Sequence, residues 1–162
     1  MKRNNKTSLL TQSGAIAAVY VLLTMLSAAL GLASGEIQLR LGEALTILPC
    51  FTPAAVPGLF IGCLLSNILS GGVVWDVFFG SLASLLGAIG TRLLRKNRWL
   101  ACLPPILTNL FIVPQVLVRA YGLPVGLPWL MFTVGVGQVL SCGLLGQILW
   151  NALDKHRDQL FK

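Results

Sequence analysis

Five polar side chains stand in stretches of the chain that are otherwise apolar. Glu43 and Asp76 are carboxylates, while Asn67, Asn109 and Gln138 carry amides. A carboxylate accepts several hydrogen bonds and an amide both donates and accepts, so the set could bind a polar ligand. A charge at the centre of a bilayer costs about 2.5–3.5 kcal/mol on insertion scales, so polar residues there usually face a cavity. If the apolar stretches cross a membrane, these five are candidate binding residues.

The composition indicates that the apolar stretches do cross a membrane. The chain is 56% hydrophobic and 10% charged, with a mean hydropathy of +0.82, which is outside the usage of soluble domains. Its apolar runs lack the alternation of barrel strands, which favours helices. We therefore predict a single membrane domain over residues 1–162, an all-α bundle of six transmembrane helices at about 12–33, 42–52, 55–70, 75–92, 99–121 and 128–153.

The segment 41–70 decides how many times the chain crosses. It contains Pro49, Pro53 and Pro57, which break a helix. Read as two short helices, it returns the basic cluster 92–98 to the side of the basic N-terminus, as the positive-inside rule requires. The prediction is a multi-pass protein of the bacterial cell membrane with both termini cytoplasmic. A cleavable signal peptide ending near 32–34 is the alternative, although an apolar stretch of about 20 residues favours an uncleaved helix.

This topology places the five polar residues in the outer half of the bundle, but several of them, and the two arginines nearby in the sequence, have a simpler explanation. Arg40 could pair with the carboxylate three residues later on one helix face. Asp76 could complement a helix N-terminus, and Asn67 could cap a helix end. Gln138 could make an interhelical hydrogen bond, and Arg119 is expected to extend to the outer surface.

Small residues recur at four-residue spacing, which lets helices approach closely in lipid. In the helix at 75–92 they are expected to pack within the subunit: Gly80, Ser84 and Ala88. In the helix at 12–33, docking to another protein is an open alternative for Ser13, Gly14, Ala17 and Ala18.

Several classes of function are disfavoured. The chain has no phosphate-binding G-x-x-x-x-G-K-[ST] loop, and its one histidine, His156, lies in the C-terminal tail, so we expect no ATPase, metal site or cofactor. The basic residues flank the predicted helices, so their charge reports topology rather than nucleic-acid binding. The four cysteines are read as small core residues. A solute receptor that borrows a motor fits best; a motor-free channel, or an enzyme using Ser66 and Glu43, are the alternatives.

Two motifs resemble those of the QueT family. They are the runs 38–49 (QLRLGEALTILP) and 55–63 (AVPGLFIGC), followed by Asn67, Asp76 and Gly80–Ala83. The similarity extends over about residues 10–153. It implies the substrate-binding S component of an energy-coupling factor (ECF) transporter for queuosine precursors, the 7-deazaguanine bases. Its implied partners are a membrane T component and two ATPase subunits, with the small residues of the first helix contacting the T component.

The resemblance also implies a site. A carboxylate such as Glu43, with Arg40 beside it, would accept the N1–H and amine of a guanine-like edge, and Asp76 would meet an aminomethyl cation. Asn67, Asn109 and Gln138 would read the remaining polar atoms. An aromatic ring would stack on the base, and the candidates are Trp75, Phe78, Trp129 and Phe132.

One departure from the family pattern concerns Gln138, where glutamate is common after a glycine. Glutamine has the same shape but cannot neutralise a cation, so this chain is expected to differ in the precursor that it prefers. An S component for another small nutrient is the alternative, because the scaffold alone does not fix the solute.

Overall fold

Helices make up the regular structure of the described chain. The computed structural model describes residues 5–32, 37–122 and 124–156, and no strand occurs among them. The elements are α1 (Asn5–Ala29), η1 (Leu41–Cys50), α2 (Ala55–Leu69), α3 (Val74–Leu93), η2 (Leu100–Cys102), α4 (Leu103–Tyr121), α5 (Leu127–Gln138), η3 (Val139–Leu145) and α6 (Gly146–Asp154). The basic Lys2, Arg3, Arg157 and Lys162, used to predict the topology, lie outside the described residues.

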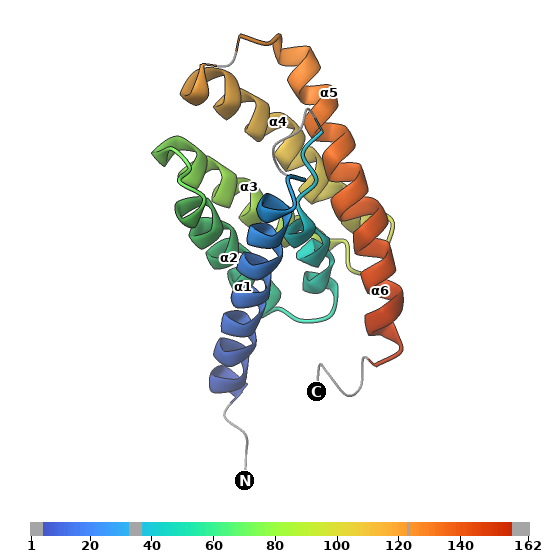
Figure 1. The fold of residues 1–162 in the computed structure, drawn as a ribbon. Helices are drawn as coiled ribbons and strands as arrows, with labels where there is room; N and C mark the ends of the chain where they lie inside the picture. Colours follow the sequence, from blue (N-terminus) through green and yellow to red (C-terminus); the bar gives the residue numbers. More distant parts are fainter. Residues whose placement is uncertain (1–4, 33–36, 123, 157–162) are drawn as a thin grey trace.

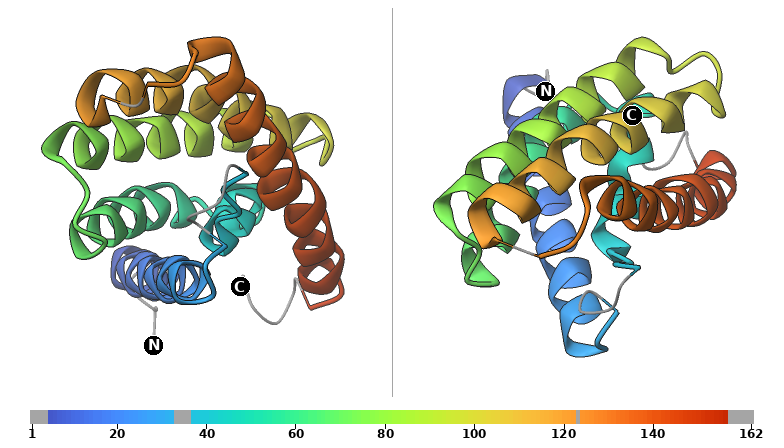
Figure 2. Two further views of the ribbon diagram at one scale, coloured as in Figure 1. Left: turned by 45° about the horizontal axis from the view of Figure 1, so that its top comes forward. Right: turned by 90° about the horizontal axis from the view of Figure 1, so that it is seen from above.

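The helices form a bundle around the short segment η1. Helix α1 packs on α2, α2 on α3, α3 on α4 and α4 on α5, while η1 contacts α1, α3, η3 and α6. Figure 2 shows α3 and α4 lying over α1 and α2, with α5, η3 and α6 as one continuous run beside them. The start of α1 and the end of α6 lie at one end of the bundle, and the α2–α3 connection lies at the other (Figure 1).

Residues 41–70 form two helices, as the prolines predict. Pro49 lies inside η1, and residues 51–54 separate η1 from α2. Segment η1 is a 3₁₀ helix of ten residues, too short to cross a hydrocarbon core of about 30 Å. Nearly all of its residues are buried by the surrounding helices. This burial keeps its backbone away from lipid, which a short and irregular segment requires.

Glycines set the closest helix contacts. A Cβ on Gly62 of α2 would lie 2.8 Å from the Tyr20 Cβ of α1. A Cβ on Gly87 of α3 would lie 2.8 Å from the Pro105 Cα of α4. Gly80, Ser84 and Ala88 of α3 are all buried. The prediction that this stripe packs within the subunit is therefore confirmed.

The small residues of α1 divide into two sets. Ser13 and Ala17 are buried, and the Ser13 hydroxyl donates to the carbonyl oxygen of Ala54 at 2.9 Å. Gly14 and Ala18 are exposed instead. One half of the predicted docking stripe thus packs against the chain's own residues, and the other half faces outward.

The outer surface suits a lipid environment. Four helical stretches are long and apolar enough to span a membrane: Lys6–Ala29, Val74–Leu93, Leu100–Tyr121 and Leu127–Asp154. Large apolar side chains project outward from them, among them Leu10, Leu22 and Val74, which are 75%, 68% and 82% exposed. In water such a surface would be an aggregation hazard, whereas in lipid it is the expected one.

Candidate functional site

Glu43 lies at the centre of a buried polar network. Its side chain is 1% exposed. The Tyr20 hydroxyl of α1 donates to Glu43 Oε1 at 2.5 Å, and the Cys142 thiol of η3 approaches Oε2 at 3.9 Å. An unpaired carboxylate in a low-dielectric interior is costly, so the second oxygen, with only a weak thiol donor, retains capacity for a stronger one.

The network continues from Cys142 towards α4. The Cys142 thiol donates to Gln138 Oε1 at 3.1 Å, and the Asn109 amide donates to the same oxygen at 3.4 Å. Asn109 also donates to the Pro105 carbonyl oxygen of its own helix at 2.9 Å. Gln138 therefore makes the interhelical hydrogen bond that the simpler explanation predicts, and this bond belongs to the same network as Glu43.

A second chain of hydrogen bonds begins at Arg40, directly before η1. Arg40 Nη2 donates to Asn67 Oδ1 of α2 at 2.7 Å. The Asn67 amide donates to the backbone oxygen of Asp76 at 3.4 Å. The Tyr121 hydroxyl, at the end of α4, donates to Asp76 Oδ2 at 3.0 Å. These bonds join Arg40, which directly precedes η1, to residues of α2, α3 and α4.

The segment before η1 is held in place by backbone and side-chain contacts. The Leu41 N–H donates to the Ser27 hydroxyl at 2.8 Å. A Cβ at Gly137 would collide with the carbonyl oxygen of Gln38, and one at Gly42 would collide with the Thr24 hydroxyl. These close approaches fix the positions from which Arg40 and Glu43 enter the bundle.

Three acidic or basic side chains occur in these two chains of bonds. Glu43 and Asp76 are acidic and Arg40 is basic, and Arg40 interacts electrostatically with both carboxylates. Among the described residues no ion pair joins Arg40 to Glu43, because each takes a different hydrogen-bond partner. No group of three or more histidine, cysteine or acidic side chains able to hold a metal occurs in the described part of the chain.

The structure contradicts the simpler explanation for Asn67 and agrees with those for Asp76 and Arg119. Asn67 does not cap the end of α2, because its side chain binds Arg40 and the backbone of Asp76. Asp76 does lie in the first turn of α3, so its helix-terminal role and its bond from Tyr121 coexist. Arg119 is exposed, as expected.

The predicted stacking residues are not brought to the network. Trp75, Phe78, Trp129 and Phe132 are between 50% and 63% exposed. Trp129 and Phe132 contact each other on α5, and Trp75 stacks on Phe79 with ring centroids 5.7 Å apart. Their role in binding stays a prediction.

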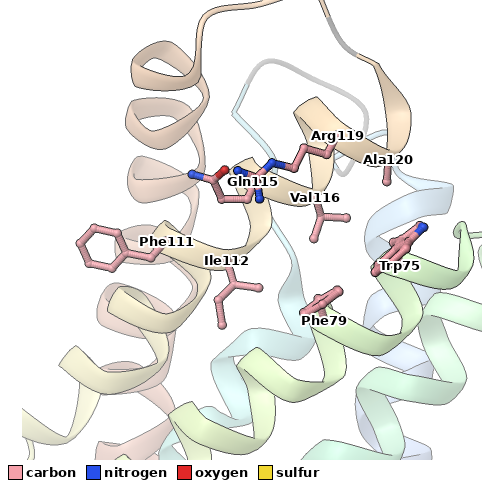
Figure 3. A pocket seen from close by; sticks show the side chains of 8 residues that line it. All are labelled: Trp75, Phe79, Phe111, Ile112, Gln115, Val116, Arg119 and Ala120. Atoms are coloured by element: carbon pink, nitrogen blue, oxygen red, sulfur yellow. The ribbon is translucent and has the colours of Figure 1, made fainter.

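A separate groove of about 580 Å³ lies between α3 and α4. Figure 3 shows Trp75 and Phe79 on one wall and Ile112, Val116 and Ala120 on the other. None of the polar network residues lines it. The groove and the network are therefore distinct features of the same helices.

Sequence reasoning missed three members of the network, namely Tyr20, Tyr121 and Cys142. Tyr20 had a detectable signal, because polar residues recur on its face of α1. The residues Ser13, Tyr20, Thr24 and Ser27 follow one another at helical spacings of seven, four and three positions. All four cysteines are buried, as expected, and Cys142 also lies between Glu43 and Gln138.

Comparison with known proteins now identifies the family. The sequence pattern of the QueT transporter family matches residues 10–155. The chain belongs to the QueT transporter family. A curated relative, the queuosine precursor transporter QueT of Lactococcus lactis subsp. cremoris (strain MG1363), is 34% identical over 85 residues, which are 52% of this chain and 49% of the relative. The match thus spans about half the length of that relative. No solved structure matches this QueT family member.

Proposed function

We propose that this QueT family protein is the substrate-binding S component of an ECF transporter and captures a queuosine precursor, a 7-deazaguanine base. The observation that carries the proposal is the buried Glu43, which has a free acceptor capacity inside an otherwise satisfied network. Family membership, and the description of the Lactococcus relative as a queuosine precursor transporter, support the substrate class.

The chemistry of the network suits such a base. A guanine-like edge presents an N1–H and an exocyclic amine side by side, and one carboxylate can accept from both. Glu43 is the candidate for this contact. Asn109 and Gln138 belong to the same network as Glu43 and would supply amides for the carbonyl and ring nitrogen atoms. Their mutual bond is long, at 3.4 Å, so a ligand could displace it at small cost.

Arg40, Asn67 and Asp76 are the candidates for the ring substituent. Asp76 is half-buried, and Tyr121 holds one of its carboxylate oxygens. The other oxygen could meet an aminomethyl cation. Because Gln138 is neutral in this chain, Asp76 would carry that contact alone.

The topology proposed with this function has six crossings and both termini in the cytoplasm. Four long apolar helices and the two shorter ones, η1 and α2, support it. A bundle of this kind without a phosphate-binding loop requires a partner to hydrolyse ATP. We propose that a T component docks on the exposed half of the α1 stripe, at Gly14 and Ala18, because Ser13 and Ala17 are already covered.

Ligand-induced thermal stabilisation of the purified protein tests the substrate class. The panel is guanine, two or more 7-deazaguanines, riboflavin and thiamin. A bound ligand raises the unfolding temperature by mass action, and we expect the 7-deazaguanines alone to do so. No response to any 7-deazaguanine at high concentration would refute the substrate assignment. Stabilisation by riboflavin or thiamin instead would indicate that the protein binds a different nutrient.

Co-purification tests the S-component role separately. The protein is expressed with a T component and two ATPases, and Gly14→Leu is compared with Ala15→Leu. Both positions are exposed, so both variants are expected to fold. Loss of the complex for Gly14→Leu only would support docking at Gly14, whereas an unaffected complex would contradict it. A chain that transports without any ATPase would be a facilitator.

A further inference from the structure

The proposed function does not use the groove of about 580 Å³ between α3 and α4. It is lined by Trp75, Phe79, Phe111, Ile112, Gln115, Val116, Arg119 and Ala120. Most of these side chains are aromatic or aliphatic, and the polar atoms come from Gln115 and Arg119. A polar base would find no carboxylate here to accept its donors, so the groove fits an apolar occupant.

The groove opens outward from the bundle. Trp75 is 63% exposed and Phe111 is 58% exposed, whereas Val116, at its inner wall, is 7% exposed. Both walls belong to helices long and apolar enough to span a membrane, and the groove lies along the first turns of α3 and the second half of α4. An occupant entering from the open side would therefore come from one leaflet of the bilayer.

The length of the groove matches one leaflet. Phe111 and Arg119 are eight residues apart on α4, which corresponds to about 12 Å along the helix axis. Half of a hydrocarbon core of about 30 Å is roughly 15 Å. An acyl chain lying along α4 from Arg119 to Phe111 would cover most of that depth.

The charge at one end of the groove defines the polar part of the occupant. Arg119 is exposed and, within the described residues, it has no hydrogen-bond or ion-pair partner. Gln115 and Arg119 are four residues apart on α4, so their side chains share one face of the helix, and both line the groove (Figure 3). A guanidinium binds phosphate oxygens in a bidentate manner, and an adjacent amide can add one further donor. Trp75 lies at the same end, where tryptophan meets the headgroup layer.

We propose that this groove is a binding site for one anionic phospholipid, whose phosphate contacts Arg119 and Gln115 and whose acyl chain lies between Phe79 and the apolar face of α4. The bound chain fills the space where the ends of α3 and α4 are separated, and so it stabilises their packing next to Asp76 and Tyr121. The proposal does not depend on which solute the protein captures.

Native mass spectrometry of the full chain in detergent tests the proposal. The protein is equilibrated with equal amounts of phosphatidylglycerol and phosphatidylcholine, and the adducts are counted. We expect phosphatidylglycerol adducts to exceed phosphatidylcholine adducts for the natural chain. Arg119→Gln should reduce that preference about fivefold, since one basic side chain at a membrane surface contributes about that much. Arg119→Lys should retain part of it.

Two further variants test whether the position of the arginine matters and whether the lipid occupies the groove. Arg95→Gln, at an exposed arginine just after the C-terminal end of α3 and outside the groove, is the matched control and should reduce the preference less than Arg119→Gln does. Ile112→Trp fills the groove and should lower the adducts of both lipids while thermal unfolding shows that the protein is folded. If it does not fold, the two Arg119 variants decide alone. An unchanged preference in Arg119→Gln, an equal loss in Arg95→Gln, or displacement of the lipid by a 7-deazaguanine would overturn the proposal.

Discussion

The network around Glu43 and the groove beside Arg119 are built from overlapping helices but have opposite properties. The network is buried and polar, and its hydrogen bonds join α1, η1, η3, α5 and α4. The groove is open and largely apolar, it involves two helices, and its one cation has no partner within the described chain. One region holds its polar side chains in internal hydrogen bonds and keeps acceptor capacity at one buried oxygen of Glu43, and the other leaves its charge available at the surface.

This difference indicates what each region can select. Buried carboxylates and amides discriminate by hydrogen-bond pattern, because an unmatched ligand leaves them unpaired in a low-dielectric interior. An apolar groove with one exposed arginine discriminates weakly, by shape and charge. The first arrangement suits a defined solute, and the second suits an abundant component of the membrane.

Replacing the central carboxylate should have the largest effect on solute binding. Glu43→Gln keeps the shape but turns an acceptor into a donor, and an unpaired ligand donor then costs about 1–3 kcal/mol, or roughly 5- to 150-fold in affinity. Isothermal titration with a 7-deazaguanine measures it. Asp154→Asn, at an exposed acidic residue, is the control. Equal affinities in the natural chain and Glu43→Gln would remove Glu43 from the site.

Removing the buried hydroxyl of Tyr20 should have the second-largest effect, and this effect should be on the free energy of unfolding. Tyr20→Phe deletes the donor to Glu43 Oε1 and leaves a buried carboxylate oxygen unsatisfied, at a cost of about 1–3 kcal/mol. Denaturant or thermal unfolding measures the change. Tyr121→Phe is the matched control, because its bond to Asp76 is exposed and should be worth less. A larger loss in Tyr121→Phe would reverse the contrast between buried and exposed polar groups.

Placing a glutamate at position 138 should alter the preference between ligands rather than the stability of the protein. Gln138→Glu places a second carboxylate near Cys142 and Asn109. We expect the affinity for an aminomethyl-bearing base to rise about fivefold relative to a neutral nitrile-bearing one, which corresponds to about 1 kcal/mol. Competition binding with the two bases measures the ratio. A ratio that stays constant would place the substituent away from Gln138.

Changing the groove should have the smallest effect on solute binding. Arg119→Gln is a surface substitution remote from the network, so the affinity for a 7-deazaguanine should change by less than about 0.5 kcal/mol. The same titration measures it in detergent, without added phospholipid. A large loss would mean that the groove and the network act as one site.

Much of the architecture could be predicted from the sequence, because apolar length and proline position act locally. The break between η1 and α2 follows from Pro49, Pro53 and Pro57, and it lies at residues 51–54 as the pattern requires. The close packing of α3 follows from its spaced small residues. The exposure of Arg119 follows from its position near a helix end. The 3₁₀ form of η1 and the π-helical form of η3 were not predicted, because both depend on neighbours rather than on composition.

The candidate site could be predicted only as a set of residue types. The sequence by itself determined that Glu43, Asn67, Asp76, Asn109 and Gln138 lie in apolar surroundings, where each needs a partner. The tertiary structure alone decided the partners: Tyr20 rather than Arg40 for Glu43, and Asn67 for Arg40. It also placed the predicted aromatic rings outside the network. The physical reason is that a helix fixes which residues share a face, whereas the rotation and approach of five helices fix which faces meet.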